Sequence, residues 1–226
     1  MKIKKLISAL VLGSMLVGLS GCNITDFSAE NLLRPPKAVG DEAEIEQLIA
    51  KTADSGYTLK YPKNGKFRSA IIMTDLDGND SNEAVAFFRN SAETSSVHML
   101  VMYSKDNSWE IASDNIFETT DIDSVDFADL TGNGKAEIIV NSTTYTPNVG
   151  KLSCYSYSEG KTNEVGSGQS CSSFVTGDFD NDGTSEIMSL VLYTTENEAL
   201  ASMLDYNEDS KSLYAKAMAN MDPNEI

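Results

Sequence analysis

A nine-residue acidic segment occurs three times in this chain and constrains its fold more than any other feature. The copies align without gaps, and their first residues lie 54 and 49 residues apart, at Asp75–Glu83, Asp129–Glu137 and Asp178–Glu186. Recurrence at an interval of this size is typical of repeat proteins, whose units stack because no single unit can bury its own faces. The sequence therefore predicts a modular architecture with one acidic segment in each unit.

Short runs rich in β-branched and aromatic residues flank every acidic segment and predict strands. The runs lie at 67–74, 84–88, 97–103 and 109–112 in the first unit, at 125–128, 138–140 and 151–157 in the second, and at 173–176, 187–193, 199–206 and 212–217 in the third. Four antiparallel strands in about 50 residues make one β-propeller blade. We expect an all-β fold of about three blades, at residues 65–115, 117–166 and 170–218 of a repeat region spanning 57–226.

The first 21 residues have the layout of a secretory signal peptide. Three lysines precede an apolar run at 6–19 that is too short to span a bilayer comfortably. The small residues before Cys22 resemble the lipobox of bacterial lipoproteins, in which this cysteine is acylated. We predict lipidation at Cys22 and an extracytoplasmic protein anchored to the cell membrane, since each buried CH₂ of an acyl chain contributes roughly 0.8 kcal/mol.

The segment after Cys22 is expected to connect this anchor to the repeats. Residues 22–40 are polar, lack periodicity and contain a Pro-Pro pair, as in an extended tether. A short helix is predicted at 41–53, in a segment spanning 41–56, and Asp41 with Glu44 forms a capping-box pattern. Its apolar residues share one face, which predicts packing against the repeats: Ile45, Leu48 and Ile49.

The charge of the chain limits its partners. Removal of the signal peptide leaves 14 basic against 34 acidic side chains, a net charge of about −20. Such a surface excludes nucleic acid and anionic lipid as natural partners, whereas divalent cations or a basic surface suit it.

Each acidic segment places oxygen-bearing side chains at positions 1, 3, 5 and 9. Alternate residues of a tight loop can point inward, so this spacing gathers oxygens around one hard cation, and the position-9 carboxylate closes the cage. Calcium tolerates irregular oxygen cages that magnesium does not. The predicted side-chain ligands of Ca²⁺ are Asp75, Asp77, Asn79 and Glu83, then Asp129, Thr131, Asn133 and Glu137, then Asp178, Asp180, Asp182 and Glu186.

The same loop sequences are compatible in principle with two other structures. An EF-hand needs a glutamate at position 12 and flanking helices, but position 12 is Ala86, Val140 or Ser189 inside a predicted strand, which excludes it. An Asx-turn hairpin without a metal stays open. Ligand charge tunes affinity, so we predict the order third, first, second. Asp80 replaces the glycine expected at position 6 of the first loop.

With these residues in place, the chain resembles the FG-GAP or VCBS repeat family, whose blades build integrin-type β-propellers. The pattern Asp-x-[Asp/Asn]-x-[Asp/Asn]-Gly-x-x-[Asp/Glu] matches fully in the third loop, and once substituted in each of the others, over a region covering residues 65–218. The resemblance implies that position-7 carbonyls also bind calcium, which would be those of Ser81, Lys135 and Thr184.

The number of units departs from the family. Propellers close with typically four to eight blades, and only three are visible. Three explanations stay open: the chain belongs to a longer protein, blades associate between chains, or a degenerate strand at 57–62 and the C-terminal end help to close the ring. A truncated chain is the interpretation that we prefer.

Cys154 and Cys171 remain after Cys22 is assigned to the anchor, and both lie near predicted strands of neighbouring repeats. An exported chain permits a disulfide between them, and two small buried thiols are the alternative.

We predict a binding or adhesion module that recognises a protein or a glycan, with Tyr155 and Tyr157 as the first aromatic pair to examine. A structural assembly component, with calcium serving stability alone, is the alternative. A propeller hydrolase or lyase has little support, because His98 is the only histidine and lies within an apolar predicted strand.

Overall fold

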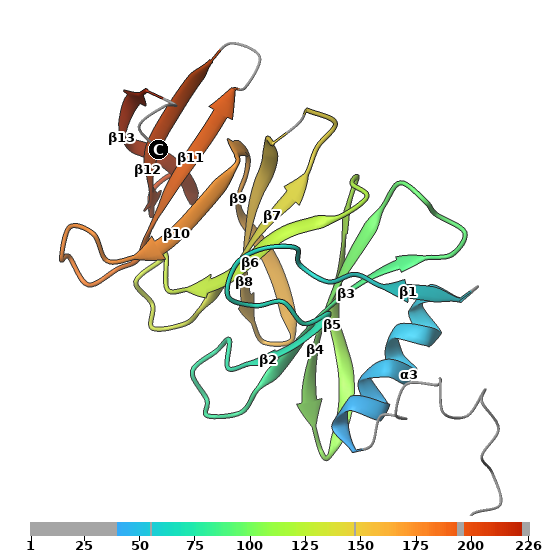
Figure 1. Cartoon of the computed structure of the whole chain (residues 1–226). Coiled ribbons are helices and arrows are strands. Elements are labelled where there is room, and N and C mark those ends of the chain that lie inside the picture. The colour runs from blue at the N-terminus through green and yellow to red at the C-terminus, as the bar shows by residue number, and fades with distance from the viewer. Residues whose placement is uncertain (1–39, 55, 147, 194–196, 223–226) are drawn as a thin grey trace, which may run out of the picture. The chain divides into compact units, whose positions relative to one another are not determined.

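The computed structural model describes residues 40–54, 56–146, 148–193 and 197–222, and these form an all-β fold with one short helix (Figure 1). The predicted signal peptide, Cys22 and all of the tether except Gly40 lie outside the described residues. The predicted fold class is confirmed: the strands form three antiparallel, blade-like sheets, none of which closes into a barrel within the described ranges. Among these residues no helix is long and apolar enough to cross a membrane.

Apart from one additional strand in the first sheet, each sheet has four strands that pair in chain order as simple hairpins. The first sheet contains β2 (Ile71–Thr74), β3 (Glu83–Asn90), β4 (Val97–Lys105) and β5 (Ser108–Phe117). The second contains β6 (Ile122–Ala128), β7 (Glu137–Thr143), β8 (Gly150–Ser158) and β9 (Lys161–Cys171). The third contains β10 (Ser173–Gly177), β11 (Glu186–Tyr193), β12 (Glu198–Asn207) and β13 (Ser212–Met221).

The β1 strand (Tyr57–Leu59) is a fifth member of the first sheet. It pairs with β3, where Leu59 lies opposite Phe88, beyond the stretch of β3 that pairs with β2. The possibility that this segment and the C-terminal end help to close a ring is wrong for the described residues, because β13 pairs with β12 instead.

Alternation along the strands gives the second sheet two buried faces. In β7, Ile138 and Val140 share a core with the first sheet, whereas Ile139 between them packs in a core with the third. Successive side chains of a strand point to opposite faces, so a single strand contributes to both cores. The two layers of core therefore hold the second sheet between its neighbours in the chain.

Tyr155 and Tyr157 lie within the core between the first and second sheets. Their side chains are only 9% and 4% exposed, and the Tyr155 ring packs edge-on against Phe117. They do share one face of β8, but that face is buried, so the prediction that they form the first ligand platform to examine is wrong.

The helix α3 (Asp41–Ala53) covers the other face of the first sheet. Ile45 and Ile49 are buried in a core with Phe88 and Leu100, as the helical spacing predicted, and Leu48 is half-buried beside them. The capping-box prediction is wrong, because the helix begins after Gly40, and Asp41 lies in its first turn and forms no side-chain cap. The Gly40 carbonyl accepts the N–H of Ala43 instead, at 3.1 Å.

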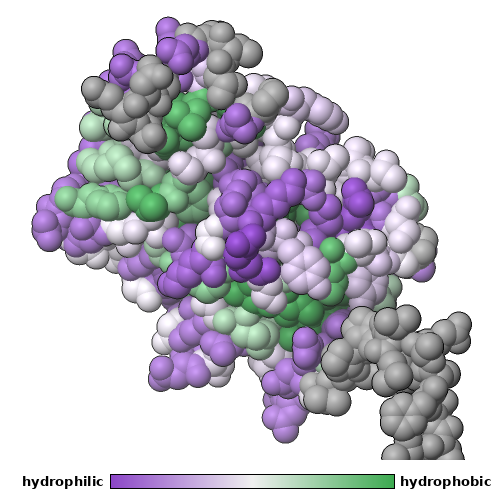
Figure 2. All heavy atoms as spheres, in the orientation of Figure 1, coloured by the Kyte–Doolittle hydropathy of each residue, from purple (hydrophilic) through white to green (hydrophobic). Residues whose placement is uncertain are grey.

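The outer face of the third sheet differs from its equivalents in the other two. Val175, Met188 and Met203 align across β10, β11 and β12 on the face opposite Ile187, and Val175 is 58% exposed. The residues equivalent to Met188 are Val85 and Ile139, which pack against the following sheet. Figure 2 shows apolar side chains at the surface over this third sheet.

Cys154 and Cys171 are both free and buried, so the structure contains the two thiols rather than the bridge. Both also lie in the second sheet, on β8 and β9, and not in neighbouring units as predicted. Burial raises the pKa of the Cys171 thiol to about 12 and that of Cys154 still further, which keeps both groups protonated and apolar in character.

The packing of α3 gives a direct test of the core. We expect Ile49→Ala to lower the free energy of unfolding by about 2–4 kcal/mol, because it removes buried methylene groups and leaves a cavity. The matched change Leu48→Ala, at a half-buried position one residue away, should cost only about 1 kcal/mol. Urea denaturation monitored by circular dichroism would measure both values. Equal losses would contradict the orientation of the helix.

Candidate metal centre

The three acidic segments occupy the same place in the three sheets. Each one joins the first strand to the second, between β2 and β3, β6 and β7, or β10 and β11. Position 9 is in every case the first residue of the second strand. The predicted placement of one acidic loop per sheet is therefore confirmed.

A common set of hydrogen bonds folds all three loops around the position-1 aspartate. Its two carboxylate oxygens accept the backbone N–H groups of positions 5 and 6, and the position-5 oxygen in turn accepts the N–H of position 7. The bonds to position 1 measure 3.2 and 2.9 Å at Asp75, 3.1 and 2.8 Å at Asp129, and 3.1 and 3.1 Å at Asp178. The position-7 residues Ser81, Lys135 and Thr184 donate at 2.7, 2.8 and 2.8 Å. The loops are thus preshaped by their own backbone.

Hydrogen bonds within the loops also lower the pKa values of two aspartates. Desolvation acts to raise the pKa of Asp75, but hydrogen bonds from the backbone N–H groups of Asp80 and its neighbours outweigh it and lower the value. The hydroxyl and N–H of Thr184 lower the pKa of Asp182 in the same way. Both side chains are therefore held as carboxylates.

Left-handed backbone recurs at two positions of every loop. Position 6 has φ of 65° at Asp80, 79° at Gly134 and 95° at Gly183, so the aspartate adopts the conformation expected of glycine there. Position 4 has φ of 73° at Gly78, 70° at Gly132 and 62° at Asn181. The nine-residue pattern did not indicate that position 4 also requires left-handed backbone, although its glycine and asparagine are residues that tolerate this region.

The position-9 glutamates are buried beneath the loops. Glu83, Glu137 and Glu186 are 3%, 1% and 0% exposed, and each accepts the backbone N–H of position 2 at 2.8 Å. Burial raises the pKa of Glu83, which the nearby carboxylates of Asp77 and Asp75 reinforce, and burial also raises the pKa of Glu137. A buried carboxylate is stable only if its charge is compensated by hydrogen bonds, a proton or a cation.

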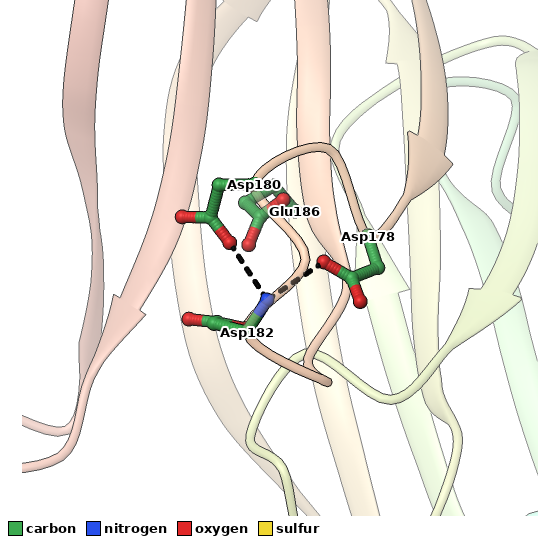
Figure 3. A group of neighbouring side chains, drawn as sticks. All are labelled: Asp178, Asp180, Asp182 and Glu186. Atoms are coloured by element: carbon green, nitrogen blue, oxygen red, sulfur yellow. Dashed lines mark hydrogen bonds between the residues drawn. The ribbon is translucent and has the colours of Figure 1, made fainter.

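The third loop brings four carboxylates together. Asp178, Asp180, Asp182 and Glu186 each offer one oxygen, and these oxygens lie within 4.8 Å of one another (Figure 3). The Oε1 atom of Glu186 is buried and has no hydrogen-bond partner. An orphaned buried oxygen in a cluster of carboxylates fits a bound cation, because the cation would supply the missing partner.

The first loop forms a similar but smaller group. Asp75, Asp77 and Glu83 offer oxygens within 4.8 Å of one another, and Oδ1 of Asp77 is buried without a partner. A hollow of about 360 Å³ lies beside the group and is also lined by Asn79 and Tyr157. These residues can hold a metal, with one carboxylate fewer than the third loop.

The second loop satisfies its buried glutamate internally. The Thr131 hydroxyl donates to Oε1 of Glu137 at 3.2 Å, while Oε2 accepts the N–H of Leu130. Asp129 and Glu137 are its only carboxylates, and Asn133 supplies a neutral oxygen at position 5. Threonine at position 3 therefore replaces an aspartate and gives the glutamate a donor, which reduces the need for a cation.

A lysine distant in the sequence completes the third loop. The ammonium group of Lys216 on β13 contacts Oδ2 of Asp180 and lies 2.9 Å from Oδ2 of Asp205. Hydrogen bonds to Asp180 and then Asp205 raise the pKa of Lys216 above its usual value. The other oxygen of Asp180 accepts the N–H of Asp182 at 3.2 Å. No local sequence signal indicates this contact, which depends on β13 returning past the loop.

Neighbouring loops are joined by backbone hydrogen bonds. Ala136 of the second loop donates to the Leu76 carbonyl of the first at 3.1 Å, and Ser185 of the third donates to the Asp129 carbonyl of the second at 2.8 Å. The loops therefore form a continuous row at one end of the strands of the three sheets.

His98 contributes to the core rather than to a reactive site. Its ring is 6% exposed, stacks on Phe88 with centroids 4.8 Å apart, and places Nδ1 2.9 Å from Oδ1 of Asp114. These contacts agree with the structural role expected from its position in the strand.

Comparison with known proteins adds no relative: no protein-family model matches this sequence, and no curated protein matches it. Membership of the FG-GAP or VCBS family therefore stays a prediction that depends on the loop pattern.

The contact between loops can be tested at two glycines. A Cβ atom on Gly132 would lie 2.7 Å from Cγ2 of Thr184, whereas one on Gly134 would meet nothing within 4 Å. Both glycines have positive φ, so we expect Gly134→Ala to cost roughly 1–2 kcal/mol of unfolding free energy for its left-handed backbone alone. Gly132→Ala should cost more, because it adds the steric conflict.

The double variant Gly132→Ala with Thr184→Ser separates the two causes, since serine keeps the hydroxyl but lacks Cγ2. It should recover the difference between the two alanine variants in chemical denaturation. No recovery would show that the loops do not touch in this way.

Proposed function

We propose that this chain is a calcium-binding, lipid-anchored extracytoplasmic module that recognises a protein or glycan partner. The observation that carries the proposal is the buried, unpartnered Oε1 of Glu186 in a group of four carboxylates. The recurrence of the same loop in three sheets supports it, because the hydrogen-bond pattern is kept while the ligand set varies.

Calcium is favoured by the chemistry of the donors. The groups in the first and third loops offer carboxylate oxygens, with no nitrogen or sulfur donor among the residues that gather there. Oxygen-only sets suit hard cations, and calcium accepts the irregular geometry of a short loop better than magnesium does. The order of affinity is third, first, second, in line with the decreasing number of carboxylates.

The N-terminal sequence supports the proposed location. The signal-like segment and Cys22 would place the mature chain outside the cytoplasm on a lipid anchor, where calcium is abundant enough to fill weak sites. The acidic net charge of −17 for the whole chain argues against a nucleic-acid partner. The FG-GAP or VCBS resemblance is consistent with a recognition role and remains part of the proposal.

A purely structural role for calcium is the second candidate. The bond between Ser185 and Asp129 links the third loop to the second. A cation in the third loop would therefore stabilise the contact between sheets, whether or not the protein binds a partner.

Replacement of Glu186 by Gln tests the metal site. In a chelator, the variant should be at least as stable as the wild type, because a neutral amide replaces a fully buried carboxylate with an unpartnered oxygen. In millimolar calcium, the wild type should gain thermal stability through RT ln(1 + [L]/Kd), and the variant should lose most of that gain. Differential scanning calorimetry measures both effects.

The matched control is Glu137→Gln, at the equivalent position of the second loop. It should remove little of the calcium-dependent gain, because the second loop is the weakest of the three proposed sites and its glutamate is already hydrogen-bonded through both oxygens. If calcium does not change the thermal unfolding midpoint of the wild type, the loops are turns that bind no metal and the proposal is rejected.

Lys216 should weaken calcium binding at the third loop. A unit positive charge about 5 Å from a divalent ion opposes its binding by on the order of 1 kcal/mol even at the dielectric constant of water. Lys216→Met should therefore tighten calcium binding several-fold in isothermal titration calorimetry. Weaker binding would show instead that Lys216 acts by orienting the Asp180 carboxylate.

A further inference from the structure

A polar cavity lies at the ends of the strands opposite to the acidic loops. Its volume is about 440 Å³, within the range of roughly 300–1,000 Å³ common for ligand pockets. It is formed where the segment after β1, the start of β6, the end of β7 and the junction between β9 and β10 meet. Its polar lining includes Lys63, Asn64, Asp123, Asn141, Thr144 and Asn148.

The floor of this cavity contains a buried amide and a carboxylate. Asn141 is 1% exposed, and its Nδ2 makes only long hydrogen bonds, 3.4 Å to Asp123 and 3.3 Å to the Cys171 carbonyl. Its Oδ1 is buried and has no partner. Asn64 donates to Asp123 at 2.9 Å from the other side. Asn141 is therefore covered and supports the floor, while the exposed Asn64 amide and the half-buried Asp123 carboxylate can donate to and accept from a ligand.

The rim carries hydroxyl and amide groups beside an exposed aromatic ring. Thr144 and Asn148 line the cavity from the β7–β8 loop, and both are exposed. Tyr145 lies between lining residues Thr144 and Thr146, and its 95% exposed side chain projects from the loop without lining the cavity itself. A fully exposed tyrosine offers a flat apolar face together with a hydroxyl group, a combination that is common at binding surfaces.

The charges near the cavity cancel, in contrast to the rest of this acidic chain. Lys60 and Lys63 both pair with Asp121, the latter at 3.1 Å. Among the residues that line the cavity, the charged side chains are Lys63 and Asp123, one of each sign. The cavity therefore attracts neither strong anions nor cations, and a ligand must be recognised by hydrogen bonds and ring stacking.

From these features we infer that the cavity is a binding site for a neutral oligosaccharide. Vicinal hydroxyl groups match paired amide and carboxylate groups such as those of Asn64 and Asp123, and the apolar face of a sugar ring matches the exposed ring of Tyr145, which projects from the loop at the rim. The inference rests on the proposed recognition role of the chain, for which it names the ligand class. It does not depend on metal in the acidic loops, which lie at the other ends of the strands.

Titration calorimetry of the purified protein with chitotriose, maltotriose and mannotriose tests the site, in calcium and again in chelator. At least one of these neutral sugars should bind saturably in both conditions. Tyr145→Ala and Asn64→Ala should each weaken that binding at least tenfold, and both replace exposed residues, so thermal unfolding should confirm an intact fold. The matched control Tyr214→Ala changes an exposed tyrosine of β13, a strand that supplies no residue to the cavity or its rim loop, and it should leave binding unchanged.

Absence of binding by all three sugars overturns the inference, as does binding that neither Tyr145→Ala nor Asn64→Ala weakens. The outcome is separate from that of the calcium proposal. Sugar binding retained in a protein that does not respond to calcium would support this site and reject the metal site, and a calcium response without sugar binding would do the reverse.

Discussion

The buried glutamate at the first residue of the second strand is the constraint around which each unit is organised. Glu83, Glu137 and Glu186 each accept the N–H of position 2, which draws the beginning of the loop onto the strand that follows it. A carboxylate in such a place is costly unless its charge is compensated. The second and third units meet this requirement differently. The second uses a threonine hydroxyl, whereas the third leaves one glutamate oxygen unpartnered among three further carboxylates.

The same constraint connects the loops to the packing of the sheets. The glutamate fixes which strand residues face which core, because the side chains after it alternate from one face to the other. Val85 and Ile139 consequently pack on the following sheet, and the equivalent Met188 has no following sheet among the described residues. On the opposite side, α3 covers the face of the first sheet that carries Phe88. The row of sheets is thus covered by a helix at one end and presents an apolar face at the other.

Local patterns were sufficient to predict the sheets and the loop positions, since strand alternation and the nine-residue pattern act over short distances. Features that depend on distant segments were not predictable in this way. The burial of Tyr155 and Tyr157 follows from the stacking of the second sheet on the first, and the contact of Lys216 with Asp180 follows from the return of β13. The β9 strand was missed because Lys161–Cys171 is polar and contains two glycines. Gly40 replaced the expected cap because an acidic side chain is also favourable inside the first helical turn.

The two ends of the strands differ in chemistry. This difference suits one end to stabilisation of the fold by a cation and the other to recognition of a ligand. At one end, the acidic loops hold carboxylate oxygens whose negative charge a cation would compensate, and backbone hydrogen bonds link each loop to the next. At the other, amide, hydroxyl and oppositely charged groups surround a cavity above the buried side chain of Asn141. A cation at the first end would take its ligands from a single loop. It would act on the contact between sheets through the backbone bond that joins this loop to the next. Recognition at the second end would draw on residues of several strands, so it depends on the same contact between sheets without sharing any residue with the metal site.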